Sequence, residues 1–127
     1  MSDYIIFAED DLYYSRLVEI HFKKAGFEIS LAPNGKLAIA LARKKIPDLF
    51  MVDLILPVLD GFETIKLIKS DDDLKKVRVV AISNLGQPED VEKALQLGAN
   101  DYIFKPDHTL EQIVFKVKSY FVKNSDN

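Results

Sequence analysis

Short apolar runs alternate along this chain with longer segments in which apolar residues recur every three or four positions. Nearly unbroken apolar runs occupy residues 4–8, 49–52 and 77–82, and a shorter one occupies residues 102–104. Runs of this length predict strands that are buried on both faces, as in a parallel sheet covered by helices. Apolar and polar side chains alternate over residues 27–31, which is typical of a strand near a sheet edge.

Helical periodicity fills the segments between these runs. The predicted helices cover residues 14–25, 37–44, 62–70, 88–98 and 110–121. Strict alternation of strands and helices implies a parallel sheet with right-handed crossovers. If the three least interrupted strands are central, the strand order is 2-1-3-4-5, and the second and fifth strands are edges. The predicted fold is therefore α/β, a doubly wound five-stranded parallel sheet with helices on both faces.

The composition limits the class of protein. The chain has 127 residues, the size of one domain, which we expect to span residues 1–127 with a frayed tail at 124–127. Its net charge of -3 argues against electrostatic binding to nucleic acid, which needs clustered positive charge. The absence of cysteine excludes disulfides and thiolate metal sites. With neither a basic leader nor a long apolar run, a cytoplasmic protein without a membrane partner is expected.

Polar side chains with complementary chemistry lie at the ends of four predicted strands. Glu9 and Asp10 follow the first strand, Asp53 the third, Ser83 the fourth and Lys105 the fifth. The carboxyl ends of parallel strands meet at one edge of the sheet, where open α/β sheets bind their ligands. These acids, the hydroxyl and the amine are therefore expected to converge.

Clustered carboxylates repel one another, and a divalent cation removes the conflict. Oxygen ligands suit Mg²⁺. If a phosphoryl group is added, Lys105 can neutralise one of its oxygens and Ser83 can donate to another. A carboxylate such as Asp53 can act as a nucleophile and form an aspartyl-phosphate.

Each of these residues also has an ordinary structural explanation. The acids that follow the first strand can cap a helix, Asp53 can close a turn, Ser83 can satisfy its own loop, and Lys105 can be an exposed lysine. For any one of them alone the ordinary explanation is favoured. Complementary chemistry at four separate strand ends favours a common site.

The chain resembles the receiver domain of bacterial two-component response regulators, the family typified by the chemotaxis receiver. The resemblance rests on segments that lie in family order across nearly the whole chain: residues 6–11 (IFAEDD), 52–57 (VDLILP) with Asp60-Gly61, 81–83 (AIS), 98–102 (GANDY) and Lys105-Pro106. It implies the flavodoxin-like receiver fold and a phosphorylation-dependent signalling switch. It also implies that the chain is no enzyme beyond catalysing its own phosphorylation and dephosphorylation.

The resemblance also implies roles for the residues of the predicted site. Asp53 becomes the phosphoacceptor, which takes a phosphoryl group from the phosphohistidine of a histidine kinase or phosphotransfer protein. Glu9 and Asp10 become the acid pair that holds Mg²⁺ together with Asp53 and the backbone carbonyl of Ile55. Lys105 becomes the phosphate-binding lysine.

Further roles follow from the same resemblance. Ser83 becomes the hydroxyl that moves on activation, and Tyr102 the aromatic side chain whose rotamer reports the state. The face of the fourth helix, fifth strand and fifth helix becomes the binding surface for a downstream protein. The Lys105–Pro106 peptide bond is implied to be cis.

Four residues depart from the usual family pattern. Asn84 replaces a small residue and Asp107 replaces phenylalanine, while Ile55 and Leu85, which flank the route of an attacking water in this family, are both apolar. These departures affect reaction rates and donor preference more than the basic chemistry.

Three alternatives remain at this stage. A magnesium-dependent phosphatase of the haloacid-dehalogenase type has a second Asp two residues after its nucleophile, where this chain has Ile55. A flavodoxin has a Ser/Thr-rich loop after its first strand, where this chain has the acids of residues 9–11, which repel phosphate. The third is a receiver-like module that binds partners without phosphorylation.

The sequence also bears on the output of the switch. No DNA-binding domain, diguanylate cyclase signature or kinase histidine motif follows the last predicted helix. If the chain is complete, its output is a contact with another protein and not with nucleic acid.

Overall fold

Strands and helices alternate strictly in the computed structural model, which describes residues 2–125, with side chains through residue 121. The elements, in chain order, are β1 (Tyr4–Ala8), α1 (Leu12–Lys24), β2 (Glu28–Ala32), α2 (Gly35–Lys44), β3 (Leu49–Asp53), α3 (Gly61–Ser70), β4 (Arg78–Ser83), α4 (Pro88–Gln96), β5 (Asp101–Phe104), a short 3₁₀ turn η1 (Lys105–Asp107) and α5 (Leu110–Ser125). Each of the predicted strands and helices is present.

The five strands form one parallel sheet in the order β2-β1-β3-β4-β5. This confirms the predicted topology, including the two edge strands. In the register of the sheet, Asp53 at the end of β3 lies opposite Ile82, and Ser83 at the end of β4 lies opposite Phe104. The carboxyl ends of the strands therefore share one edge. The strand order reverses between β1 and β3, which is the topological switch point of the sheet.

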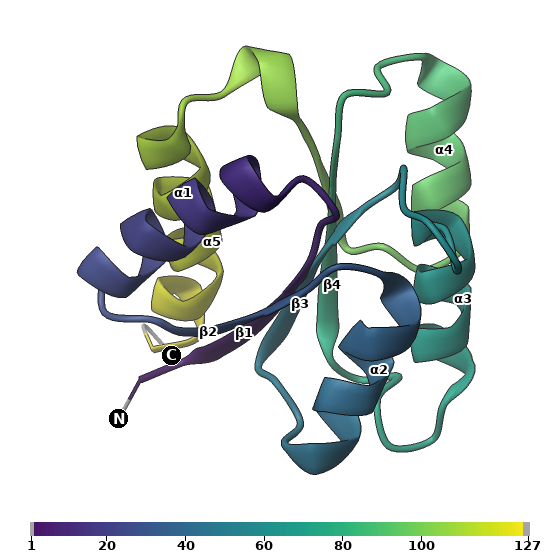
Figure 1. The fold of residues 1–127 in the computed structure, drawn as a ribbon, viewed down its shortest axis with the longest axis horizontal. Helices are drawn as coiled ribbons and strands as arrows, with labels where there is room; N and C mark the ends of the chain where they lie inside the picture. Colours follow the sequence, from purple (N-terminus) through teal and green to yellow (C-terminus); the bar gives the residue numbers. More distant parts are fainter. Residues whose placement is uncertain (1, 126–127) are drawn as a thin grey trace.

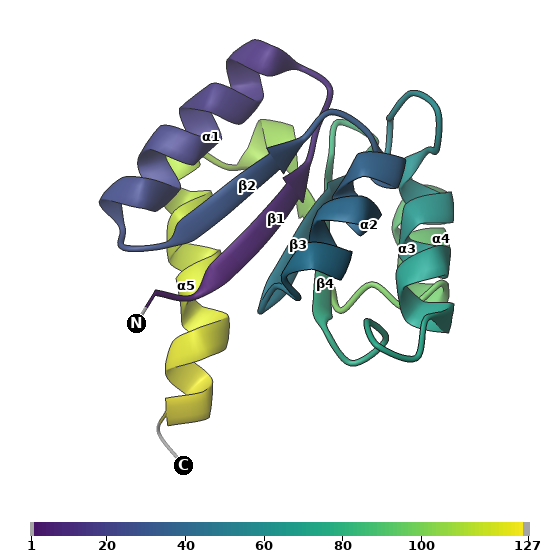
Figure 2. The ribbon, with the colours of Figure 1, turned by 60° about the horizontal axis from the view of Figure 1, so that its bottom comes forward.

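Helices cover both faces of the sheet. Figure 1 and Figure 2 show α1 and α5 on one face and α2, α3 and α4 on the other. Since successive residues of a strand point to opposite faces, β1 and β3 contribute to both sides. The buried side chains accordingly form two apolar clusters. The α1–α5 cluster includes Ile5, Phe7, Val18, Phe22, Met51, Ile113 and Val117. The α2–α3–α4 cluster includes Ile6, Ala38, Phe50, Ile65, Ile68, Val79 and Ala94.

The helices begin at capping residues that the apolar periodicity alone misses. Asp11, Asn34 and Asp60 each accept a hydrogen bond from the backbone N–H three residues ahead. Helices α1 and α2 therefore begin two residues before their predicted starts, and α3 begins one residue before its own.

The ends of the last two helices also differ from the predictions. Helix α4 stops at Gln96, and Gly98 follows it with φ of +115°, a conformation that glycine tolerates. Helix α5 is assigned through Ser125, four residues beyond the end of the predicted apolar stripe, and the expected frayed tail at 124–127 stays a prediction. Residues 126 and 127 lie outside the described residues. Within the described residues, no helix has both the length and the apolar character needed to cross a membrane.

Candidate functional site

Three carboxylates meet at the carboxyl edge of the sheet. Glu9 follows β1, Asp53 ends β3, and both are buried, whereas Asp10 is exposed. One carboxylate oxygen from each lies within 4.8 Å of the others. This set of oxygen ligands, two buried and one open to solvent, suits a hard divalent cation such as Mg²⁺ that keeps some of its water.

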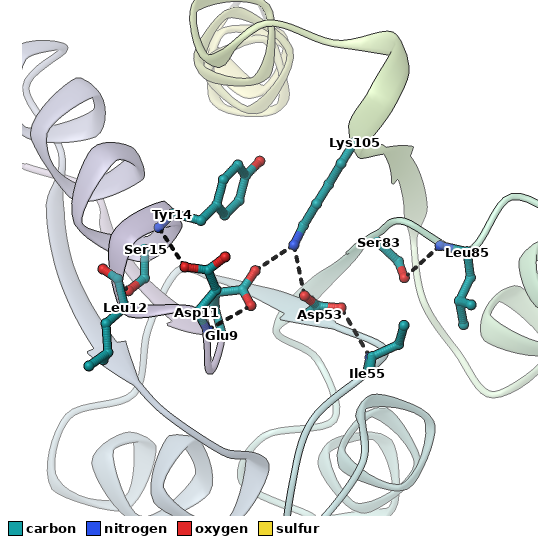
Figure 3. A network of polar contacts seen from close by, with 10 residues as sticks. All are labelled: Glu9, Asp11, Leu12, Tyr14, Ser15, Asp53, Ile55, Ser83, Leu85 and Lys105. Carbon is teal, nitrogen blue, oxygen red and sulfur yellow. Dashed lines mark hydrogen bonds and ion pairs between the residues drawn. The ribbon is translucent and has the colours of Figure 1, made fainter.

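Lys105 joins the two buried acids. Its Nζ lies 2.6 Å from Glu9 Oε1 and 2.8 Å from Asp53 Oδ2, and its side chain is only 11% exposed (Figure 3). Burial disfavours the charged amine, but the hydrogen bonds to Asp53 and Glu9 outweigh burial and raise the pKa of Lys105 above its ordinary value. The lysine is therefore a fixed positive charge beside Asp53.

The pKa of Glu9 is raised to about 7. Burial is the main cause, and the hydrogen bond and charge of Asp53 add to it, while Lys105 opposes the change. One lysine does not fully compensate two buried carboxylates. A further positive charge beside Glu9 and Asp53 would therefore be stabilised near neutral pH.

The loop after β3 fixes the orientation of Asp53. The Ile55 N–H donates to Asp53 Oδ1 at 3.0 Å, and the Gly61 N–H donates to the Leu54 carbonyl at 3.0 Å. A Cβ on Gly61 would lie 2.1 Å from the Asp53 carbonyl oxygen, so only glycine lets the start of α3 approach this closely. Asp53 therefore sits on the rigid end of a buried strand with one of its oxygens held by the loop.

Val58 in the same loop has a strained backbone. Its φ is +69°, and the neighbouring Leu59 N–H donates to the Pro57 carbonyl at 2.7 Å in a tight turn. A β-branched residue rarely adopts this conformation. The Val58 side chain is 80% exposed, so burial of the side chain does not account for the strain.

The Lys105–Pro106 peptide bond is trans, since the described residues contain no cis peptide bond. The prediction of a cis bond was wrong. Residues 105–107 instead form the 3₁₀ turn η1, which brings the lysine to the carboxylates with the peptide bond in its lower-energy form.

Helix capping explains only one of the acids that follow β1. Asp11 Oδ1 accepts the Tyr14 N–H at 3.0 Å and is the N-cap of α1. Glu9 instead turns toward Lys105, and its second oxygen accepts the Asp11 N–H at 3.2 Å. The same loop thus caps a helix and supplies two of the three clustered acids.

Ser83 is fully buried, and among the described residues its hydroxyl makes no hydrogen bond to Asp53. Ser83 Oγ accepts the Leu85 N–H at 3.1 Å, and the Tyr102 hydroxyl donates to the Leu85 carbonyl (Figure 3 for Ser83 and Leu85). Burial raises the pKa of the Tyr102 phenol, although the nearby Ser83 hydroxyl opposes the change. Both residues that the resemblance assigns to the switch therefore bind the backbone of the β4–α4 loop.

The convergent residues line a cleft of about 190 Å³. Its lining residues are Glu9, Asp10, Asp11, Asp53, Ile55, Asn84 and Lys105. Asn84 and Ile55 are exposed at this cleft, and Asp107 is exposed beyond Pro106. Leu85 does not line the cleft, because its side chain packs against the α2–α3–α4 cluster. Only one of the two apolar residues expected to flank an attacking water is therefore at the cleft.

One aromatic residue of the site was missed in the sequence. The Lys105 Nζ lies 4.4 Å from the centre of the Tyr14 ring (Figure 3). The sequence signalled Tyr14 only as the first residue of an apolar helical stripe, which predicts core packing. Its contact with a lysine from the other end of the chain appears only once the sheet is assembled.

Comparison with known proteins gives a consistent result. A family model for the response regulator receiver domain matches residues 5–118. The DNA-binding dual master transcriptional regulator RpaA of Synechocystis is 34% identical over 115 residues, which cover 91% of this chain and 47% of RpaA. The polar-differentiation response regulator DivK of Brucella anthropi is 32% identical over 120 residues, which cover 94% of this chain and 97% of DivK.

Solved structures have the same fold. The Vibrio cholerae chemotaxis protein CheY4 matches with a TM-score of 0.87 at 23% identity, over 94% of this chain and 98% of that one. The Mn²⁺-bound response regulator Rcp1 matches with a TM-score of 0.83 at 28% identity, over 94% of each chain. The chain spans 39% to 60% of the length of three transcriptional regulators that it matches.

Proposed function

The chain belongs to the response regulator receiver domain family of two-component signalling, and from this premise we propose that it is a switch whose Asp53 accepts a phosphoryl group. Receiver domains are signalling domains that work with histidine kinases and downstream effectors. The phosphoryl donor proposed here is the phosphohistidine of a histidine kinase or phosphotransfer protein. The observation that carries the proposal is the Lys105 ammonium, which bridges Glu9 at 2.6 Å and Asp53 at 2.8 Å.

The proposed reaction is a displacement at phosphorus. A carboxylate oxygen of Asp53 forms a bond to phosphorus while the bond from phosphorus to the donor's nitrogen breaks, and the departing imidazole keeps that electron pair. The Ile55 N–H orients the Asp53 carboxylate, and Lys105 balances negative charge on the transferred group. The reaction needs no protein base, because a carboxylate nucleophile has no proton to give up as it attacks phosphorus.

Mg²⁺ fits the acids of this cleft. Glu9, Asp10, Asp53 and the Ile55 carbonyl would hold it, and when bound it neutralises charge on the phosphoryl oxygens. The pKa of Glu9, raised mainly by burial and further by Asp53, supports this fit, because a bound cation would favour the ionised form of both acids. The remaining contributions come from the protein: the buried strand end carries Asp53, and Lys105 stays protonated beside it.

The proposed output is a shift between two arrangements of the β4–α4 loop. A phosphoryl group on Asp53 would draw the Ser83 hydroxyl toward it, and the Leu85 N–H would lose its partner. Tyr102 would then settle in a new position, and the surface of α4, β5 and α5 would change for a downstream protein. No membrane or direct nucleic-acid contact is part of the proposal.

The alternatives have less support. A switch that works without phosphorylation would not need a buried lysine between two acids at the end of a central strand. A phosphatase of the haloacid-dehalogenase type would need a carboxylate where this chain has Ile55. Catalysis is therefore proposed to extend only to the chain's own phosphorylation and dephosphorylation.

The test is phosphorylation by acetyl phosphate with Mg²⁺, followed by intact-mass spectrometry. The wild-type protein should gain one phosphoryl group, and Asp53→Asn should gain none. Asp107→Asn, an exposed acid outside the cleft, is the matched control and should be labelled like the wild type. Equal labelling of Asp53→Asn would refute the assignment, and failure of the wild type with both acetyl phosphate and kinases would favour the phosphorylation-independent module.

A further inference from the structure

Lys105 has a third neighbour besides its two acids. Its Nζ faces the Tyr14 ring at 4.4 Å from the centroid, on α1, while the carboxylates of Glu9 and Asp53 lie at 2.6 and 2.8 Å (Figure 3). We propose that Tyr14 is a positioning residue for Lys105, whose ring keeps the ammonium beside Asp53 when a bound cation takes over the carboxylates. This inference rests on the proposed function, because it concerns the same reaction.

The ring itself is firmly placed. It packs edge-on against Phe7 at a centroid distance of 6.3 Å and an interplanar angle of 66°, and Phe7 is fully buried in β1. The backbone N–H of Tyr14 is held by the Asp11 cap at 3.0 Å. A ring fixed from both sides can orient a flexible lysine at little cost in side-chain entropy of its own.

The ring and the carboxylates attract the lysine in different ways. The carboxylates are negative charges, and a divalent cation bound to them both uses their oxygens and repels the ammonium. The ring attracts the ammonium through its quadrupole, an attraction that a cation on the carboxylates does not consume. Burial raises the pKa of the Tyr14 phenol, so the residue stays neutral near neutral pH. The ring contact is therefore the one that survives cation binding.

The attraction needs the ring and not the hydroxyl. In Figure 3 the Tyr14 hydroxyl points away from the carboxylates of Glu9 and Asp53, and among the described residues it has no hydrogen-bond partner. Tyr14→Phe should therefore keep the function, and Tyr14→Leu should lose it while still filling apolar space. Tyr13→Leu is the matched control, since Tyr13 precedes it on α1 and is 77% exposed.

The first measurement does not depend on phosphorylation. A proton over an aromatic ring resonates upfield, so the Lys105 Hε signals, assigned by their loss in Lys105→Met, should be shifted upfield in wild type, Tyr14→Phe and Tyr13→Leu, and not in Tyr14→Leu. Saturating Mg²⁺ should leave the shift in place in the first three proteins. Loss of the upfield shift on adding Mg²⁺ to the wild type would overturn the proposal, and this arm needs no variant of Tyr14 to fold.

The second measurement is the rate of phosphorylation by acetyl phosphate at saturating Mg²⁺. Tyr14→Leu should be slower by roughly three- to tenfold, the range of a partly buried cation–π contact, and Tyr14→Phe should stay within about twofold of wild type. Equal rates for Tyr14→Leu and Tyr13→Leu would overturn the positioning role. If the wild type is not phosphorylated at all, the proposed function fails. The Lys105 Hε shift still tests whether the Tyr14 ring keeps its contact with Lys105.

Discussion

The backbone N–H and the backbone carbonyl of Leu85 are each hydrogen-bonded by one of the two residues that the family resemblance assigns to switching. Ser83 accepts the Leu85 N–H at 3.1 Å, and Tyr102 donates its hydroxyl to the Leu85 carbonyl. Ser83 ends β4 and Tyr102 lies in β5, so the loop between β4 and α4 is pinned to two strands. A movement of either side chain therefore changes the restraints on this loop.

Tyr102→Phe should loosen the β4–α4 loop. The substitution removes the hydrogen bond to Leu85 and leaves the ring in place, so the free energy of unfolding should fall by about 1 kcal/mol. Amide exchange should become faster for residues 84–87, as measured by hydrogen exchange with NMR. Tyr13→Phe, at an exposed position, should leave that exchange unchanged. Unaltered exchange in Tyr102→Phe would mean that the hydroxyl does not restrain the loop.

Mg²⁺ binding should strengthen as the pH rises through about 7. Because the pKa of Glu9 is raised to about 7, the cation must displace a proton below that pH. Isothermal titration calorimetry between about pH 6 and about pH 8, in buffers of different ionisation enthalpy, should detect the release of about one proton at the acid end. Glu9→Gln should bind Mg²⁺ more weakly and without this pH dependence. A proton release that is the same in both proteins would place the titrating group elsewhere.

The metal-free protein should show the opposite trend in stability. A carboxyl group whose pKa is raised on folding stabilises the protein at low pH, and this contribution is lost as the pH rises from about 4.5 through about 7. The difference in free energy of unfolding between wild type and Glu9→Gln should therefore change by on the order of 2 kcal/mol over that range. Urea titrations at several pH values measure it. A difference that does not vary with pH would contradict the raised pKa.

Ile55→Asn should shorten the life of the phosphorylated protein. Ile55 is 55% exposed at the cleft and its side chain cannot hydrogen-bond a water, whereas asparagine can hold one in line with the bond to phosphorus. The rate of dephosphorylation should rise about fivefold, a barrier change of ~1 kcal/mol. The measurement is the decay of phosphorylated protein after removal of the donor, with Leu67→Asn on α3 as the control. Matching decay in Ile55→Asn and wild type would show that this side chain does not control the water.

Val58→Gly should stabilise the protein. Glycine relieves the strain at φ of +69°, and the loss of an 80% exposed side chain removes no core packing. After the extra chain entropy of glycine is subtracted, the gain should be about 1 kcal/mol in the free energy of unfolding. Val58→Ala is the control because it keeps a Cβ and much of the strain. If the two variants unfold at the same urea concentration, the strain is not the cause.

The sheet could be predicted from the sequence because a strand buried on both faces is apolar at nearly every position. The unbroken run that ends at Asp53 fits the middle of a covered sheet, and this places Asp53 at the carboxyl end of a central strand. Helix starts were less accurate, since caps such as Asp11 and Asn34 are polar and carry no periodicity.

Other features depend on distances that a sequence does not contain. The contact of Tyr14 with Lys105 depends on a ring rotamer and on a turn at the far end of the chain. Leu85 could face either the cleft or the core, and the apolar cluster under α4 decides between them. The peptide bond before Pro106 was misjudged from the resemblance, where the intrinsic preference for trans was the better guide.

The division of the core by the sheet has a mechanical consequence. Apolar side chains around α1 and α5 form one cluster, apolar side chains around α2, α3 and α4 form another, and the strands of the sheet lie between them. Leu85 and Tyr102 both pack on the α2–α3–α4 side. A rearrangement of these two side chains would therefore disturb the packing of the α2–α3–α4 cluster directly, and would reach the α1–α5 cluster through the strands that lie between the two.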